Sequence, residues 1–217
     1  MDNECRLQEE DLLKRIDGVK RVHKVLVGIG EEWSIGRRPD IMAAYEALGK
    51  LLNGKDYFIV TMNTDGKIFE SSLDHSRIVA PCGNVHWFQC EKACTKDIWE
   101  EGEVQDGVCP HCGAPLISNT IKAEAYIEEG YLPQWTAYTK WLSGTLNRDL
   151  TVLELGVGFQ LPGVIRWPFE KTVFFNKKAH MYRVHETFYQ ISEELRDKAE
   201  GIRSDSVEFI EKSPTIW

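Results

Sequence analysis

The feature that most constrains how this chain can fold is two closely spaced pairs of cysteines. The pairs are Cys90/Cys94 and Cys109/Cys112, fourteen residues separate them, and the second forms the sequence C-P-H-C-G. Two thiolate pairs at such spacings complete a tetrahedron around Zn²⁺. Four sulfur ligands leave no coordination position for water, so we expect a structural zinc rather than a catalytic one. His111 lies inside the second pair and could replace a sulfur, although the four cysteines suffice.

The composition of the chain limits which partners it can bind and indicates its cellular compartment. The 217 residues carry a formal net charge of −8, which argues against nucleic-acid binding, including binding of DNA by the zinc module, because phosphates require Lys and Arg. No apolar run has the length of a membrane span, and the polar N-terminus is unlike a signal peptide. Metal binding by four of the six cysteines suits a reducing compartment. We therefore expect a cytoplasmic protein without nucleic-acid or membrane partners.

Apolar runs alternate with amphipathic segments along the chain, which predicts parallel strands connected by helices. We expect helices at 7–22, 40–52 (with Asp40 as N-cap), 133–146 and 185–200. We expect strands at 24–27, 56–63, 77–81, 149–158, 172–176, 181–184 and 207–211. The predicted fold class is α/β, with a Rossmann-like parallel sheet flanked by helices. Residues 1–85 and 119–217 would form this domain, and residues 86–118 an inserted zinc-ribbon module.

Polar or glycine-rich residues follow three of the predicted strands. They are Gly28 and Gly30, Asn63 and Asp65, and Gly156 and Gly158. Because the carboxyl ends of parallel strands line the ligand crevice of such sheets, we expect these residues to lie close together. Glycine at these ends lets backbone N–H groups approach phosphates. The pattern favours a nucleotide site, the alternative being ordinary strand-to-helix turns.

The order of these motifs resembles that of the sirtuins, the Sir2 family of NAD-dependent deacylases. The chain carries Gly28-Ile29-Gly30 for the family's G-A-G-I-S, Thr61-Met62-Asn63-Thr64-Asp65-Gly66 for T-Q-N-I-D-G, Cys82-Gly83 for H-G, the four zinc cysteines, Gly156-Val157-Gly158 for G-T-S-L, and Phe175-Asn176 for the I-N strand. The resemblance covers about residues 22–211. It implies NAD and Zn²⁺ as cofactors and a Rossmann-like NAD domain with an inserted zinc ribbon.

The resemblance also implies which residues contact NAD. Gly28, Gly30, Gly156 and Gly158 would lie near the phosphates. Asn63 and Asp65 would lie at the nicotinamide end, and Asn176 would reach the adenosine ribose. Asp65 would hold the carboxamide of the nicotinamide.

Several positions depart from the family pattern. Cys82 replaces the His that acts as general base, and a thiol with an ordinary pKa near 8.5 would lower base catalysis by roughly 10²–10⁴-fold. His86 could replace the base, although a lone His beside a zinc module is more often structural. Met62 replaces a Gln that contacts the nicotinamide ribose. Glu31 and Glu32 would bring negative charge near the pyrophosphate unless they point away.

The residues expected to cleave the nicotinamide–ribose bond are present, whereas the base for acyl transfer is absent. We therefore expect NAD cleavage for ADP-ribosyl transfer to a protein acceptor, with weak or absent deacylation. The catalytic set would be Asn63, Asp65 and Cys82. One alternative is a catalytically inactive module that binds NAD or ADP-ribose. Another is a methyltransferase that uses S-adenosylmethionine, because T-V-L-E-L-G-V-G is similar to the strand and turn that hold that cofactor, although such a turn normally opens its domain.

Overall fold

A parallel sheet forms the main body of the computed structural model, which describes residues 22–212. The sheet has six strands in the order β3-β2-β1-β7-β8-β9. Their bounds are β1 Lys24–Ile29, β2 Asp56–Thr61, β3 Ile78–Val79, β7 Leu150–Leu155, β8 Ala179–Val184 and β9 Ala199–Ile202. Every pairing between neighbours is parallel. This order is that of the doubly wound α/β folds, so the predicted fold class is confirmed.

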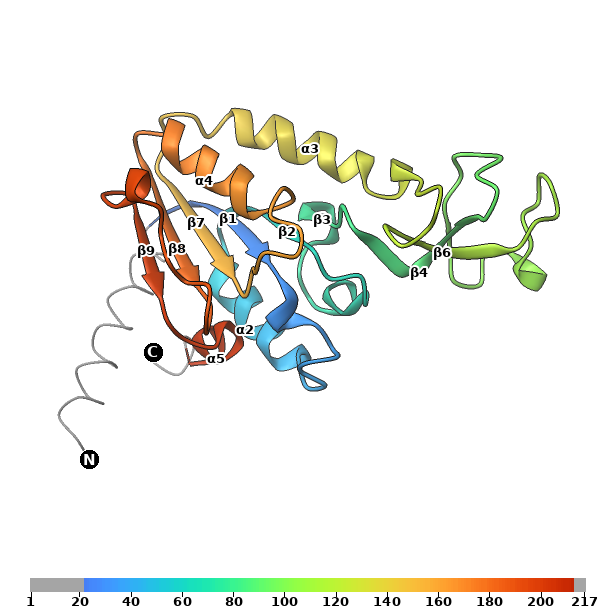
Figure 1. Ribbon diagram of the computed structural model, residues 1–217, viewed down its shortest axis with the longest axis horizontal. Helices are drawn as coiled ribbons and strands as arrows, with labels where there is room; N and C mark the ends of the chain where they lie inside the picture. Colours follow the sequence, from blue (N-terminus) through green and yellow to red (C-terminus); the bar gives the residue numbers. More distant parts are fainter. Residues whose placement is uncertain (1–21, 213–217) are drawn as a thin grey trace.

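Helices cover both faces of the sheet (Figure 1). Helices α2 (Met42–Leu52) and α5 (Ser206–Glu211) lie on one face, and α3 (Leu132–Ser143) and α4 (Arg166–Phe175) on the other. The central strand β1 alternates between the two cores: Val25 and Val27 pack in the core that includes α2, and Leu26 packs in the core that includes α4. A strand buried on both faces appears in sequence as a continuous apolar run, which is why β1 was predictable.

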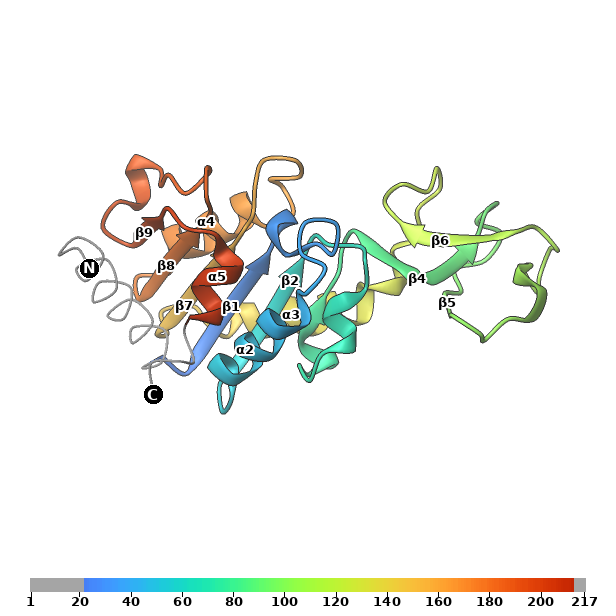
Figure 2. The same cartoon turned by 90° about the horizontal axis from the view of Figure 1, so that it is seen from below.

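A second, antiparallel sheet of three strands carries the cysteine pairs and extends away from one end of the main sheet (Figure 2). Its strands, in the order β5-β4-β6, are β4 Gly83–Cys90, β5 Trp99–Glu100 and β6 Leu116–Thr120. The chain enters and leaves this sheet side by side, because Gly83 pairs with Thr120 and the Ile121 N–H donates to the Cys82 carbonyl oxygen. The module's division from the main domain at 86–118 remains a prediction.

Short 3₁₀ helices complete the described elements. They span Glu31–Trp33, Lys67–Glu70, His75–Arg77, Gln105–Gly107, Glu128–Gly130 and Glu193–Leu195. Within residues 22–212, none of the helices has the length and apolar character needed to cross a membrane.

Most predicted elements are confirmed. The expected strands at 24–27, 56–63, 77–81, 149–158 and 181–184 correspond to β1, β2, β3, β7 and β8, and the helices at 40–52 and 133–146 to α2 and α3. The helix expected at 7–22 falls outside the described residues except for its last position. Asp40 is not the N-cap of α2, because Ile41 occupies that position and no side chain caps the helix.

Three element predictions are wrong. Residues 172–176 end helix α4 rather than forming a strand, because Val173 continues a buried helical stripe that begins at Arg166. Residues 207–211 belong to helix α5, because the Asp205 side chain accepts from the N–H groups of Val207 and Glu208 and so caps a helix. Residues 185–200 contain a loop, one 3₁₀ turn and the start of β9 in place of the expected helix.

Candidate functional site

Three of the turns singled out in the sequence lie together at the carboxyl edge, which is the edge at which the parallel strands end. Strand β1 lies between β2 and β7, and its last residue, Ile29, pairs with Thr61 on one side and Leu155 on the other. The turns after these strands therefore begin level with one another. The strand order also reverses at β1, and ligands of doubly wound folds bind at such a point.

The turns after β1 and β7 touch through their backbones. The Gly30 N–H donates to the Leu155 carbonyl oxygen at 2.9 Å. A Cβ on Gly30 would lie 2.3 Å from the Gly156 carbonyl oxygen, so a side chain cannot fit there. Gly156 adopts φ +62°, and a Cβ there would lie 2.5 Å from the Cβ of Glu32. Gly30, at φ −109°, is required because another backbone segment approaches it closely. Gly156 is required because it combines a close contact with left-handed geometry.

Gly28 packs against helix α4, and its expected place beside the NAD phosphates stays a prediction. It lies within β1, and a Cβ there would lie 2.5 Å from Ile165 Cγ2 and 2.7 Å from Phe169 Cε2. Its missing side chain lets helix α4 pack closely on the sheet. Gly28 thus allows α4 to lie close to β1 at the point where β1 ends.

Asn63 and Asp65 follow β2 and fix the shape of the same edge. The Asn63 side-chain amide donates to the Gly30 carbonyl oxygen at 3.0 Å. One carboxylate oxygen of Asp65 accepts from the Ile35 N–H at 2.8 Å, and the other accepts from the Lys67 N–H at 3.1 Å. The two side chains tie the turn after β2 to the segment that follows β1. They hold fixed polar groups at the place where the resemblance puts the nicotinamide end.

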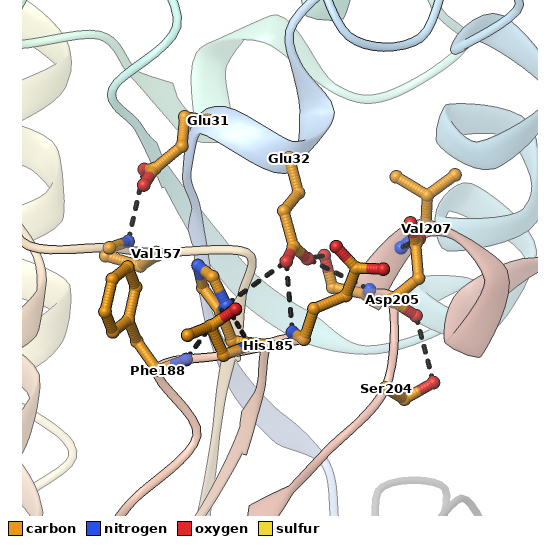
Figure 3. Close-up of polar contacts among 12 residues, drawn as sticks. Glu31, Glu32, Val157, His185, Phe188, Ser204, Asp205 and Val207 are labelled. Carbon is orange, nitrogen blue, oxygen red and sulfur yellow. Dashed lines mark hydrogen bonds and ion pairs between the residues drawn. The ribbon is translucent and has the colours of Figure 1, made fainter.

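The Glu32 side chain packs its Cβ and Cγ near Gly156 and directs its carboxylate toward His185 and the start of α5 (Figure 3). Its side chain is 2% exposed. The carboxylate accepts from the Ser206 N–H at 3.1 Å, the Ser206 hydroxyl at 2.6 Å and the Glu186 N–H at 3.1 Å. These donors come from the start of α5 and the turn after β8, so Glu32 joins two elements. A buried carboxylate with three donors is compatible with the fold and keeps its charge out of the crevice.

Glu31 points the other way, into the turn after β7 (Figure 3). Its carboxylate accepts from the Gly158 N–H at 3.1 Å. It lies so close to the glycine that a Cβ on Gly158 would be 2.0 Å from Glu31 Oε1. The sequence raised the concern that both glutamates bring negative charge to the edge. In the structure, only Glu31 does so. The contact also shows that the Gly158 N–H can donate a hydrogen bond to an anionic group in this geometry.

The sequence reasoning missed His185, which follows β8 at the same edge. Its Nδ1 accepts from the N–H groups of Thr187 and Phe188 at 3.0 and 3.1 Å, which assigns the proton of the neutral ring to Nε2. Burial lowers the pKa of this imidazole, so the 3.2 Å approach of Nδ1 to Glu32 is not an ion pair near neutral pH. Nε2 is buried without a hydrogen-bond partner among the described residues. His185 directly follows β8, which the sequence analysis placed at 181–184 without considering the residue after it.

Asn176 lies at the opposite edge. It terminates helix α4 three residues before β8 begins, and its side-chain amide donates to the carbonyl oxygens of Thr145 and Arg148 at 2.9 and 3.3 Å. Its carboxamide oxygen accepts from the Lys178 N–H at 3.0 Å. The side chain is 2% exposed. Position and hydrogen bonding both assign Asn176 to holding the α4–β8 connection, so it takes no part in the edge that carries the other candidates.

Cys82 is buried between the main sheet and the zinc module. It is 1% exposed, and burial raises the pKa of its thiol to about 11. A thiol with that pKa stays protonated at neutral pH and does not accept a proton. His86, the other candidate base, lies on the wall of a cleft beside Gly66 and Trp87, with Nδ1 3.1 Å from a carboxylate oxygen of Glu101.

The four paired cysteines form one cluster with the dimensions of a zinc site. Their sulfur atoms all lie within 4.8 Å of one another, and the Cys90–Cys112 and Cys94–Cys109 sulfurs are 3.5 Å apart. Sulfurs around a tetrahedral Zn²⁺ are separated by roughly 3.8 Å, and a disulfide would need about 2 Å. His111 faces away from the cluster, since its Nε2 lies 2.7 Å from the Asp97 carboxylate. The donor set fits a closed, structural Zn²⁺ site.

Two known proteins with similar sequences have ADP-ribosyltransferase in their names. The chain is 24% identical over 180 residues to a protein ADP-ribosyltransferase of Staphylococcus aureus (strain Mu50 / ATCC 700699), which covers 75% of this chain and 57% of that protein. It is 26% identical over 145 residues to a probable bifunctional ADP-ribose hydrolase/ADP-ribosyltransferase of Fusarium oxysporum f. sp. cubense, which covers 55% of this chain and 24% of that protein. The chain thus spans about half of one relative and a quarter of the other. No protein-family model matches it.

Solved structures place the fold. A Sir2 homologue mutant in complex with ADP-ribose superimposes with a TM-score of 0.56 at 11% identity, covering 98% of this chain and 95% of that one. A second mutant complex of a Sir2 homologue gives a TM-score of 0.53 at 12% identity, covering 100% of this chain and 99% of that one. The chain therefore has a Sir2-like fold, and the predicted resemblance is confirmed at the level of fold.

Proposed function

We propose that this protein binds NAD at the carboxyl edge of the sheet and transfers the ADP-ribosyl group to an acceptor. The observation that carries the proposal is the meeting of the Gly30, Asn63 and Gly156 turns at the switch point of a Sir2-like sheet. The names of the two sequence relatives support the choice of ADP-ribosyl transfer.

The residues at this edge suit the parts of NAD in different ways. Gly30, Gly156 and Gly158 bring segments of the chain into close contact at this edge, and we propose that a pyrophosphate binds to backbone N–H groups of these turns. Asn63 and Asp65 would meet the nicotinamide end, held in place by their backbone contacts. In the reaction, the bond between nicotinamide and ribose C1′ breaks with its electron pair going to nicotinamide. The nucleophile of the acceptor forms the new bond to C1′ and gives up its proton.

Deacylation fits the site less well. Acyl transfer in sirtuins depends on a His base, and the thiol in its place is buried and protonated at neutral pH. We therefore propose weak or absent deacylase activity. The cysteine cluster would hold the small module in shape and take no part in the chemistry. We also infer a protein acceptor from the resemblance to sirtuins, and a cytoplasmic location and no nucleic-acid partner from the composition of the chain.

The test is an incubation of the zinc-loaded protein with NAD, with nicotinamide release and protein-bound ADP-ribose followed by mass spectrometry. We expect release by the wild type and a loss of about 10²-fold or more in Asp65→Ala, because electrostatic positioning contributes that much to such sites. Asn63→Ala gives a second variant if Asp65→Ala is unstable. Asp149→Asn, at an exposed position beyond the opposite edge, is the matched control and should retain activity.

Two results would change the proposal. Binding of ADP-ribose without any nicotinamide release would favour the alternative of an inactive NAD- or ADP-ribose-binding module, which the protonated Cys82 already makes worth testing. Robust formation of O-acyl-ADP-ribose from an acyl-lysine peptide would contradict the proposed loss of deacylation. The Sir2-like fold argues against the methyltransferase alternative, because the Gly156 turn follows the fourth strand of the main sheet rather than opening the domain.

A further inference from the structure

The Glu31 carboxylate occupies the place that a phosphate oxygen would need at the turn after β7. It accepts from the Gly158 N–H and lies close to that glycine, since a Cβ on Gly158 would be 2.0 Å from Glu31 Oε1 unless the Glu31 side chain moved. The glycine surface that makes this turn suitable for a phosphate is thus covered by an acidic side chain of the same molecule. A single backbone N–H cannot serve both anions at full strength, and two like charges in contact repel one another.

The surroundings of the Glu31 carboxylate are those of an anion site rather than of a random surface contact. The Arg166 guanidinium is buried below the same turn and donates to the Val157 carbonyl oxygen at 2.9 Å and to the Phe188 carbonyl oxygen at 2.9 Å. Phe159 covers the guanidinium at 4.1 Å. The unpartnered Nε2 of His185 is a second buried donor at this edge. The Arg166 guanidinium also lies 3.5 Å from the buried Glu154 carboxylate. The charge that it shares with Glu154, together with the spare donor, favours an anion at this turn.

The two neighbouring glutamates differ in how firmly they are held. Glu32 is buried and fixed by three hydrogen bonds from two elements. Glu31 is only half-buried, and Gly158 supplies the one hydrogen bond to its carboxylate among the described residues. Its backbone is held independently, because the Ser34 hydroxyl donates to the Glu31 carbonyl oxygen at 3.0 Å. The side chain can therefore leave by rotation about its own bonds without moving the turn.

We infer that Glu31 is a specificity-determining residue that stands in for a nucleotide phosphate and must swing away before a pyrophosphate binds. This inference rests on the proposed function, since it concerns the same edge. It predicts that Glu31 weakens the binding of phosphate-bearing ligands and leaves uncharged nucleosides nearly unaffected. Glu31 thus selects against phosphate-bearing ligands. Such a ligand must bind strongly enough to offset the loss of the contact between Glu31 and Gly158.

The experiment measures the dissociation constants of ADP-ribose, inorganic pyrophosphate and adenosine by calorimetry for the wild type, Glu31→Gln and Glu31→Ala. We expect both variants to bind ADP-ribose and pyrophosphate about 10- to 100-fold more tightly than the wild type, the range of a hydrogen bond to a charged group. Adenosine affinity should change less than about threefold, because adenosine lacks the competing charge. Glu193→Gln, which removes the same charge from an exposed glutamate paired with Arg196, should leave every affinity at the wild-type value.

Each other outcome contradicts the inference in a distinct way. Equal or weaker ADP-ribose binding by both Glu31 variants would overturn it while leaving the proposed function intact. An equal gain for adenosine would show that Glu31 obstructs by bulk and not by charge. An equal gain in Glu193→Gln would assign the effect to net charge. If ADP-ribose binds neither to the wild type nor to the two Glu31 variants, NAD binding at this edge is refuted. The proposed role of Glu31 is then refuted as well.

Discussion

Two adjacent residues of the same type can have different roles when only one of them receives several hydrogen bonds from the fold. Glu31 and Glu32 are identical in chemistry and neighbours in sequence, yet only Glu32 is fixed inside the fold. A buried carboxylate needs hydrogen bonds to offset the loss of water, and Ser206 and Glu186 supply them. The same logic makes Cys82, which is buried without such donors, a neutral thiol.

We predict that Cys82 reacts slowly with iodoacetamide in the native protein. Burial raises the pKa of its thiol to about 11, so at pH 8 the thiolate fraction is more than about 100-fold lower than for an unfolded-state thiol with a pKa near 8.5. The native rate should fall by at least that factor and should rise with pH toward 11. Mass spectrometry of the Cys82 peptide, native and urea-unfolded, measures both rates.

The unfolded protein is the internal control, since the same peptide is compared in both states. A native rate within a few-fold of the unfolded rate would show that Cys82 is exposed or ionised. In that case its exclusion as a general base would have to be withdrawn.

Sequence alone identified the residues whose role depends on local pattern. The four zinc cysteines were predictable from spacing, and Gly30 and Gly156 from their places after apolar runs. The contact between Glu31 and Gly158 was not, because it joins residues 127 positions apart. His185 was hidden for the same reason: its place at the edge depends on where β8 ends.

At the scale of elements, buried charge joins β7, β8 and α4. Glu154 is completely buried and accepts from Arg183 Nε at 2.6 Å and Nη2 at 3.1 Å, while Arg166 lies 3.5 Å away. Arg183 also reaches Glu170 on α4 at 2.8 Å. Such a network is strongly destabilised when one partner is removed, because the remaining charges stay buried without compensation.

We predict that Glu154→Leu lowers the free energy of unfolding by about 3–5 kcal/mol. Glu170→Leu removes a carboxylate that is 26% exposed and should cost about 1 kcal/mol, since its charge is partly solvated. Urea unfolding followed by circular dichroism gives both values. A Glu154→Leu cost equal to or below that of Glu170→Leu would contradict the assignment of the buried network.

The elements predicted wrongly share a physical cause. The segment T-V-F-F is rich in β-branched and aromatic residues, which favour strands, yet only Val173 among them is buried. Phe169 and Val173 lie four apart, which is the helical period that should have decided the assignment. For α5, Asp205 followed by Glu208 was a capping signal at the start of a short apolar run. Packing therefore outweighed strand propensity at residues 172–176, and helix capping outweighed it at residues 207–211.

At the scale of the molecule, the small sheet depends on metal more than the large one. Its buried core consists of Cys90, Cys109 and Ala114, with Trp99 and Leu116 packed against it. Two of the three buried residues are themselves zinc ligands in our assignment. A core of this size does not offset the conformational entropy of ordering the module, so bound Zn²⁺ must supply most of its stability.

We predict that a strong chelator, or Cys109→Ser, makes residues 86–118 sensitive to limited proteolysis while the six-stranded sheet keeps its circular dichroism signal. Metal analysis should show loss of zinc in the same samples. Cys82→Ser is the control, since it removes a cysteine outside the cluster and should keep both zinc and protease resistance. Unchanged proteolysis after complete loss of zinc would mean that the module is stable without metal.

The side-by-side attachment of the small sheet, at Gly83 with Thr120 and at Cys82 with Ile121, has a consequence for how the chain finds its fold. Closing a loop of this length costs roughly 3 kcal/mol of chain entropy, and the antiparallel strands together with the metal meet that cost locally. Once they have done so, β3 and α3 are effectively neighbours along the chain. The parallel sheet then assembles with the contact order of a shorter protein, because the module no longer adds to the effective sequence separation of its strands.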